Sequence, residues 1–270
     1  MSTAAGRGGG RYEDLDWYEA PEAYDAIYDV DTAREADFLE AVHREHATPG
    51  RGRRVLEPAC GSGRLLVAMA ERGWRVRGFD LGPAMVRFSR QRLRADGLQG
   101  TVVPGDMATF ETPGRFDLAH CLVSTFKYLL TERQARAHLR AVARALRPGG
   151  VYALGFHLSR YGTSRKAHER WTVERAGTTV DCTVTTWPPD RARRRERVEA
   201  RMRVVKGSEE RRSRTAWEFR TYDAQQVQSL LRGVPELEHA ATYDFHYEID
   251  EPQVLSDRQF DTLLVLRRRP

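Results

Sequence analysis

Cysteine is scarce in this 270-residue chain. Only Cys60, Cys121 and Cys182 occur, an odd number with no pair at a metal-ligand spacing, so we expect neither a disulfide framework nor a metal site. Long apolar runs are also missing. No segment approaches the length needed to span a bilayer, and the start, Met1 to Arg11, has no apolar signal region. A reducing cytoplasm fits these absences best, and we expect no membrane partner.

Lysine is the second shortage. The chain carries 44 basic residues and a net charge of +6, but only Lys127, Lys166 and Lys206 are lysines. An arginine skew of this kind suits a high-GC coding bias, which says nothing about ligands. The arginines are also interleaved with acids, as in Arg-Arg-Arg-Glu-Arg-Val-Glu at 193–199, and mixed charge usually marks a solvated face. The sequence therefore argues against a nucleic-acid partner.

What the chain does contain is a regular alternation of short apolar strands and helices. Hydrophobic residues make up 40% of it, which supports a sizeable core. The alternation indicates right-handed βαβ units and a doubly wound α/β fold with a mostly parallel sheet. Strands are predicted at 53–57, 74–79, 101–103, 116–122 and 151–156, helices at 64–72, 83–95 and 132–146, and a helical segment at 21–46.

From Trp171 to Arg220 the pattern changes. Apolar and polar residues alternate between turn signals, which predicts an antiparallel sheet with one wet face, inserted after the fifth strand. A helix near 223–231 and strands near 237–247 and 260–266 follow. We therefore expect a disordered Gly-rich tail (1–15), a core with an N-terminal helical lid (16–157), the antiparallel insertion (158–221), and a C-terminal helix with the last two core strands (222–270).

The most informative stretch is the turn after the first core strand. Residues 55–66 read Val-Leu-Glu-Pro-Ala-Cys-Gly-Ser-Gly-Arg-Leu-Leu. Gly61 and Gly63 can take backbone angles that other residues resist, and they let a ligand approach the main chain. A turn between a parallel strand and a helix is where α/β folds hold nucleotide-like cofactors. Leu66 stands where the dinucleotide fingerprint has its third glycine, which counts against a nicotinamide cofactor.

Acidic residues follow the next two strands. Asp80 can accept both hydroxyls of a ribose, although it can also cap the helix that Pro83 opens. Asp106, with the backbone of Met107, can read the amino edge of an adenine, or it can be only a turn residue. Met85, on the helix after Asp80, can supply an apolar wall or belong to the core. The order of these residues along the chain favours the binding interpretation.

That order resembles the class I S-adenosylmethionine (SAM)-dependent methyltransferases. The resemblance covers about 24–156 and rests on Glu57-x-x-x-Gly61-x-Gly63, on Asp80, on Gly105-Asp106-Met107, and on Leu-Arg-Pro-Gly-Gly-Val at 146–151. It implies a Rossmann-like fold, SAM as the cofactor, S-adenosylhomocysteine as the product and no metal.

The resemblance also implies residue roles. Glu57 begins the motif, and the backbone at Gly61 and Gly63 would run alongside the methionine part of SAM. The remaining cofactor contacts would be Asp80 for the ribose, Asp106 and Met107 for the adenine, Met85 for an apolar wall, Cys121 and Leu122 at the exit of the fourth strand, and Tyr24 over the sulfonium.

Two accessory segments narrow the resemblance. Trp17-Tyr18 and Tyr24-x-x-x-Tyr28 resemble the aromatic lid of small-molecule N- and O-methyltransferases. The insertion resembles that of aminosugar N,N-dimethyltransferases, where it roofs the acceptor pocket and sometimes helps subunits pair. Both imply a small-molecule acceptor with an amine or hydroxyl group, and the insertion suggests a homodimer.

Methyl transfer requires alignment, and a base only for some acceptors. A neutral amine needs no strong base, whereas a hydroxyl does. His157 after the fifth strand is the first candidate base, although it can equally be a structural histidine. Tyr24 can shield the sulfonium or simply pack the lid. Lys127, Tyr128 and Tyr161 also follow strand ends.

Three other functions stay open. An NAD(P)-dependent oxidoreductase can use the same glycine turn, although Leu66 counts against it. A methyltransferase can act on RNA or protein through the Arg-rich insertion. A non-catalytic protein can keep the SAM site, since a fold does not imply a function. Val123-Ser124-Thr125-Phe126 lacks the Asn/Asp-Pro-Pro-Tyr/Phe signature of enzymes that methylate nucleobase or glutamine amides.

Overall fold

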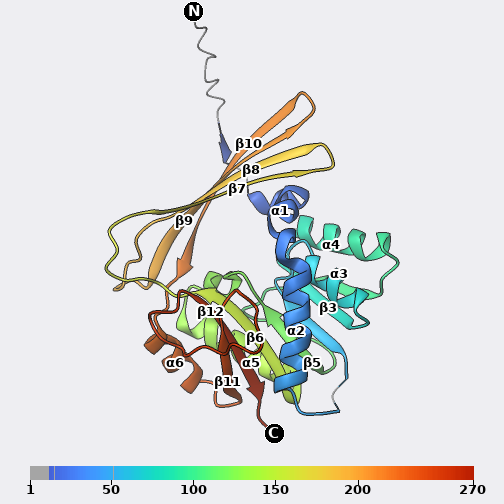
Figure 1. Ribbon diagram of the computed structural model, residues 1–270, viewed down its shortest axis with the longest axis vertical. Helices are drawn as coiled ribbons and strands as arrows, with labels where there is room; N and C mark the ends of the chain where they lie inside the picture. The colour runs from blue at the N-terminus through green and yellow to red at the C-terminus, as the bar shows by residue number, and fades with distance from the viewer. Residues whose placement is uncertain (1–11, 15, 51) are drawn as a thin grey trace, which may run out of the picture.

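Seven strands form the central sheet, in the order β11-β12-β6-β5-β2-β3-β4 (Figure 1). The computed structural model describes residues 12–14, 16–50 and 52–270. Strands β2 to β6 pair in parallel, and β12 and β11 add antiparallel pairs at one edge. The doubly wound, mostly parallel α/β fold is therefore confirmed. The strands are β2 (Arg54–Pro58), β3 (Arg75–Asp80), β4 (Gly100–Pro104), β5 (Phe116–Cys121), β6 (Leu146–His157), β11 (Leu237–Tyr243) and β12 (Asp261–Arg268).

Helices cover both faces of this sheet. One face packs on α2 (Thr32–His46), α3 (Arg64–Glu71) and α4 (Pro83–Ala95), and the other on α5 (Glu132–Ala145) and α6 (Ala224–Arg232). Two of the helices begin with a capping box, in which Thr131 and Asp223 accept the N–H groups of Gln134 and Gln226. All of β5 is buried, as expected for a strand covered on both faces.

A second sheet, antiparallel except for its edge strand β1, stands above the first (Figure 1). Its inner face packs on the lid formed by η1 (Trp17–Glu19) and α1 (Pro21–Tyr28), through buried Val180, Cys182, Ala200 and Met202. The sheet therefore rests on the lid and leaves a hollow above the central sheet. Its order is β1 (Glu13–Asp14), β10 (Glu209–Arg220), β9 (Arg195–Lys206), β8 (Thr178–Thr186) and β7 (Ala167–Arg175).

Three local predictions need correction. Glu13–Asp14 form strand β1 on the edge of β10, so the predicted disordered tail 1–15 is wrong for these two residues, while 1–11 and 15 lie outside the described residues. Strand β6 begins at Leu146, five residues earlier than predicted, because the Arg-Pro-Gly-Gly segment continues the pairing with β5 through a bulge. The helical segment 21–46 is broken into α1 and α2 by η2 (Asp29–Asp31). No described helix is long and apolar enough to cross a membrane.

A buried ion pair ties the two sheets together. Lys127 lies in η3 (Thr125–Tyr128), after β5, and donates to Glu196 Oε1 on β9 and to the carbonyl oxygen of His157 at 3.3 Å. The side chains of Lys127 and Glu196 are 3% and 8% exposed. Each charge therefore depends on the other for compensation, because neither is well solvated.

We expect Lys127→Met to destabilise the protein by about 3–5 kcal/mol, since it leaves the Glu196 carboxylate buried without its cation. The measurement is chemical denaturation followed by circular dichroism. The double variant Lys127→Met/Glu196→Gln should recover part of the loss. A single variant within 1 kcal/mol of wild type would contradict the role given to this pair.

Candidate functional site

The glycine turn lies where the strand order reverses. β2 pairs with β3 on one side and with β5 on the other, and crevices at such switch points hold ligands in open α/β sheets. Gly61 and Gly63 have φ of +52° and +73°. A Cβ on Gly63 would lie 2.8 Å from Ser89 Cβ, and Ser89 donates to the Gly61 carbonyl at 2.6 Å. Only glycine fits this turn against α4.

In the dinucleotide fingerprint the third glycine allows the helix to pack closely on the sheet. Here a glycine on the neighbouring strand, β3, allows that close packing. A Cβ on Gly78 of β3 would lie 2.5 Å from Leu66 Cδ1 and 2.9 Å from Cys60 Sγ. Helix α3 therefore approaches the sheet closely because the strand carries the glycine, and Leu66 fills the space. The absence of a third glycine at Leu66 is visible in the sequence, but no sequence signal marks Gly78.

Asp80 is bonded to the glycine turn. Its Oδ2 accepts the N–H of Gly61 and its Oδ1 that of Gly82, both at 2.8 Å. Gly82 is the residue before α4, so Asp80 also serves the start of that helix. Burial raises the pKa of Asp80, and the backbone hydrogen bonds oppose that rise. The structure brings Asp80 and Gly61 together, as the spacing predicts.

The segment at 106–107 is held in place by the neutral side chain of His138. Asp106 Oδ1 accepts the N–H of Ala108 at 2.8 Å. This hydrogen bond is the one expected if Asp106 stabilises the turn. Burial lowers the pKa of His138 to about 4, so its Nδ1–H donates to the Met107 carbonyl at 2.9 Å while Nε2 accepts from the Tyr152 hydroxyl at 2.7 Å. No sequence signal marks His138, which looks like any polar residue of an amphipathic helix. Met85 is fully buried in α4.

A small cavity of about 40 Å³ opens at the glycine turn. Glu57 lies in its wall with Oε2 buried and without a hydrogen-bond partner among the described residues. Burial raises the pKa of Glu57, against the lowering effect of Arg64. The predicted residues that line this cavity are Tyr24, Glu57, Gly61, Cys121 and Leu122. An unsatisfied carboxylate oxygen beside glycine backbone fits a ligand that brings a hydrogen-bond donor.

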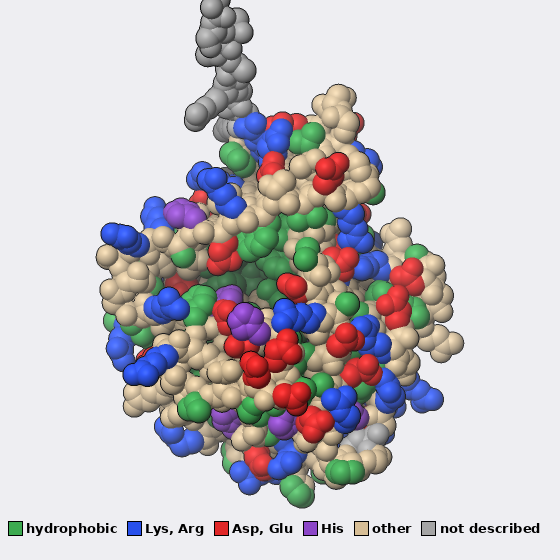
Figure 2. Space-filling model, in the orientation of Figure 1, with side chains coloured by type: hydrophobic (Ala, Val, Ile, Leu, Met, Phe, Trp, Pro, Cys, Tyr) green, Lys and Arg blue, Asp and Glu red, His purple; other side chains and the backbone are tan. Residues whose placement is uncertain are grey.

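A larger cavity of about 680 Å³ adjoins the small one. Figure 2 shows it as a hollow with apolar walls between the upper sheet and the core. Both cavities are lined by Tyr24, Tyr28, Arg64, Val123 and Thr125. The sheet, the lid and the carboxyl ends of β5 and β6 therefore enclose two spaces that meet at the same side chains.

His157 borders the larger cavity and is oriented by a carboxylate. Its Nδ1 lies 2.8 Å from Asp261 Oδ1, and its ring stacks on Phe260 at 4.7 Å between centroids. The hydrogen bond from His157 lowers the pKa of Asp261. With Nδ1 occupied, Nε2 is the ring nitrogen left to accept a proton. Asp261 was not predicted as a site residue, because it meets His157 only through the β6–β12 register.

The other candidate side chains are engaged elsewhere. Lys127 is held by Glu196, the Tyr128 hydroxyl lies 2.7 Å from that of Tyr18, and the Tyr161 hydroxyl lies 2.6 Å from Thr221 Oγ1. Among the described residues, no group of three or more His, Cys, Asp and Glu side chains could hold a metal.

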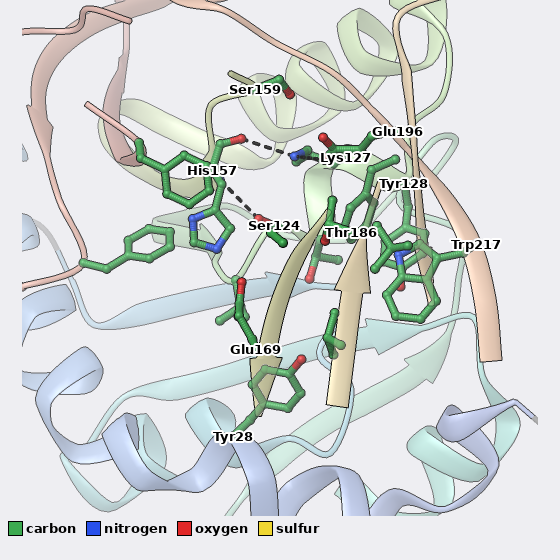
Figure 3. A pocket seen from close by; sticks show the side chains of 18 of the residues that line it. Tyr28, Ser124, Lys127, Tyr128, His157, Ser159, Glu169, Thr186, Glu196 and Trp217 are labelled. Atoms are coloured by element: carbon green, nitrogen blue, oxygen red, sulfur yellow. Dashed lines mark hydrogen bonds and ion pairs between the residues drawn. The ribbon is translucent and has the colours of Figure 1, made fainter. Parts of the chain in front are cut away.

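Strained backbone supports the histidine. Val123 and Ser124, which follow Leu122 after the end of β5, have φ of +56° and +62°, and this conformation is especially costly for the β-branched Val123. Ser124 Oγ accepts the N–H of His157 at 3.2 Å (Figure 3). Such strain persists where the surrounding structure enforces it and is common at functional sites. No sequence signal marks these two positions.

Residues 55–150 match the family model described as a methyltransferase domain. This segment is a methyltransferase domain. The resemblance to class I SAM-dependent methyltransferases is confirmed. The fold of this chain is similar to that of solved methyltransferases that act on small molecules.

Two solved structures are similar to this chain over nearly its whole length. A sugar N-methyltransferase from a Streptoalloteichus species is 24% identical, with a TM-score of 0.71, covering 100% of this chain and 99% of that one. A SAM-bound amino pentose methyltransferase from Micromonospora echinaspora, involved in calicheamicin biosynthesis, is 25% identical, with a TM-score of 0.66 over 96% and 100%.

Curated relatives match the methyltransferase domain over a shorter span. A ubiquinone biosynthesis O-methyltransferase from Stutzerimonas stutzeri is 27% identical over 136 residues, 50% of this chain and 54% of that protein. The chain spans about half the length of the curated relatives it matches.

We expect Gly63→Ala to lower the free energy of unfolding by about 2–4 kcal/mol, from the left-handed backbone and the clash with Ser89. Gly73→Ala is the matched control, because Gly73 has φ +80° with nothing within 4 Å of the added Cβ. It should cost only the backbone term, about 1–2 kcal/mol. Equal losses in the two variants, measured by denaturant unfolding, would remove the packing argument for Gly63.

Proposed function

We propose that this protein transfers a methyl group from SAM to an amine or hydroxyl of a small molecule bound in the larger cavity. One observation carries the proposal: the two cavities meet at Tyr24, Tyr28, Arg64, Val123 and Thr125. A donor at the glycine turn and an acceptor under the antiparallel sheet would then face each other. Enclosure by the lid and the sheet favours a small acceptor over RNA or a protein.

The residues of the turn fit SAM. Glu57, with its unsatisfied oxygen, and the Gly61 backbone would hold the methionine part, Asp80 the ribose, and Asp106 with Met107 the adenine. When bound, SAM supplies a methyl group already activated by a sulfonium. Tyr24 belongs to both cavities, and burial raises the pKa of its phenol. A neutral phenol there can shield a cation from water without titrating.

The role of the protein is mainly to align the reacting groups. In-line displacement gains from positioning, on the order of 7–11 kcal/mol in ideal models. His157 Nε2 would remove the acceptor proton, with Asp261 fixing the ring and stabilising its charged form. The relatives named above carry out both N- and O-methylation by their descriptions, so the first acceptor screen should pair amino sugars with their hydroxyl counterparts.

We expect Asp80→Ala to weaken SAM binding by about 1–3 kcal/mol, since hydrogen bonds to a charged group are lost. Isothermal titration calorimetry with SAM and S-adenosylhomocysteine measures it, and thermal unfolding checks that the variant is folded. Asp96→Ala, at an exposed carboxylate after α4, is the control and should bind as wild type does. Unchanged affinity in the folded Asp80 variant would refute the ribose contact.

We expect His157→Ala to reduce turnover by about 10²–10⁴-fold with SAM affinity unchanged, because the base is lost and the cofactor site is intact. Asp261→Asn should fall between this variant and wild type. The control is His168→Ala, on β7, where the ring contacts Thr185 at 3.1 Å. Wild-type turnover by the His157 variant would return that residue to a structural role.

A further inference from the structure

Among the residues that the structure describes, Arg64 is the one cation in the wall of the small cavity at the glycine turn. It is the first residue of α3, directly after Gly63, and it is 8% exposed. It also lines the larger cavity. The one acid in the wall of the small cavity is Glu57, but Arg64 pairs instead with Glu35 of α2. The wall of the small cavity therefore presents a guanidinium and a carboxylate that are not each other's partners.

Contacts with α2 and with the segment before β12 orient the guanidinium. Its Nη1 donates to Glu35 Oε2 and, at 2.9 Å, to Thr32 Oγ1. Glu35 Oε1 accepts the hydroxyl of Tyr247 at 3.0 Å, so both oxygens of this carboxylate are engaged. Tyr247 has a φ of +56°, a costly conformation that persists where the surrounding structure enforces it. Tyr247, Glu35 and Arg64 thus form one chain of contacts that ends at the cavity.

Part of the guanidinium is left over for a ligand. A guanidinium carries five N–H donors, and the contacts above use only those on Nη1. The described residues provide no acceptor for Nε and Nη2, yet neither nitrogen is one of the fully buried polar atoms that lack a partner. Because the side chain of Arg64 lines both cavities, these donors are available to an anion bound there.

The start of α3 favours an anion at the same place. No described side chain caps this helix, so its first N–H groups lack a side-chain acceptor, and the positive end of the helix dipole attracts negative charge. Gly61, Ser62 and Leu65 line the small cavity beside Arg64. A carboxylate can therefore meet Arg64 and the helix start together, while an ammonium group meets the unpartnered oxygen of Glu57. This arrangement suits a zwitterionic amino acid.

We propose that Arg64 binds the α-carboxylate of the methionine part of SAM, and that Glu35 and Tyr247 are positioning residues that hold its guanidinium. The proposal rests on the methyl-transfer function proposed above, to which it adds a residue outside the predicted set. The donor suits Arg64 better than an anionic acceptor, because it carries an ammonium group on the same carbon as its carboxylate and Glu57 lies in the same wall.

The test compares S-adenosylhomocysteine with its decarboxylated form, each titrated by calorimetry into the full chain. Wild type should bind the intact ligand about 10–100-fold more tightly, as hydrogen bonds to a charged group provide. Arg64→Gln should bind the two ligands alike, without losing affinity for the decarboxylated one. Arg64→Lys keeps the charge but not the fork of donors, and it should keep part of the preference.

A second set of variants separates binding from folding. Arg64→Gln leaves Glu35 buried without its cation, so the double variant Arg64→Gln/Glu35→Gln is measured beside it, with thermal unfolding of both. The double variant should show the same loss of preference. Tyr247→Phe keeps the ring, removes the hydrogen bond to Glu35, and should reduce the preference by a smaller factor, because the guanidinium is less firmly held.

The control is Arg87→Gln, at an exposed position of α4, which should keep the wild-type preference. The assignment is overturned if wild type binds the intact and decarboxylated ligands equally. It is also overturned if the folded Arg64 variants lose affinity for both ligands to the same extent, which is the mark of a structural role. Failure of the proposed function is distinguishable, since wild type would then bind neither SAM nor S-adenosylhomocysteine, and the role of Arg64 would fall with it.

Discussion

The packing of the aromatic lid between the two sheets is the constraint on which the site depends. Trp17 stacks on Trp217 of β10 at 5.0 Å and meets Tyr24 edge-on at 5.2 Å, so one side chain joins the sheet above to the helix below. Because the antiparallel sheet buries its apolar face against this lid, it cannot lie on the central sheet. The hollow between the two sheets therefore follows from the packing of the lid.

Electrostatic contacts fix the lid in this position. Asp25 of α1, 2% exposed, bonds to Arg92 of α4 and to Arg175 at the end of β7. Lys127 and Glu196 join the core to β9 at the far side of the hollow. Buried charges of this kind add little net stability, but they specify geometry because each partner is costly to leave alone. Lid, core and upper sheet thus hold the cavity walls in one arrangement.

The site itself combines rigid and strained parts. Asp80 and Ser89 fix the glycine turn through its backbone, and His138 fixes the carbonyl of Met107. Val123 and Ser124 are held in left-handed conformations beside His157. Fixed elements of this kind would suit the proposed in-line transfer, because small errors in alignment cost rate. A homodimer through the insertion stays a prediction.

The sequence alone determined the parts that depend on local order along the chain. The βαβ alternation, the glycine turn and Asp80 at the end of the next strand could be read directly, because parallel strands bring successive carboxyl ends to one edge. The antiparallel insertion followed from its alternation of apolar and polar residues. The strand β1 and the early start of β6 could not be read, since both depend on pairing with distant strands.

Only the tertiary structure decided how the walls of the larger cavity are built. Asp261 reaches His157 through an antiparallel register across 104 residues, and Gly78 of β3 is the glycine that allows Leu66 of α3 to pack closely on the sheet. These contacts come from long-range packing, in which a residue's neighbours are set by the whole fold and not by its place in the chain.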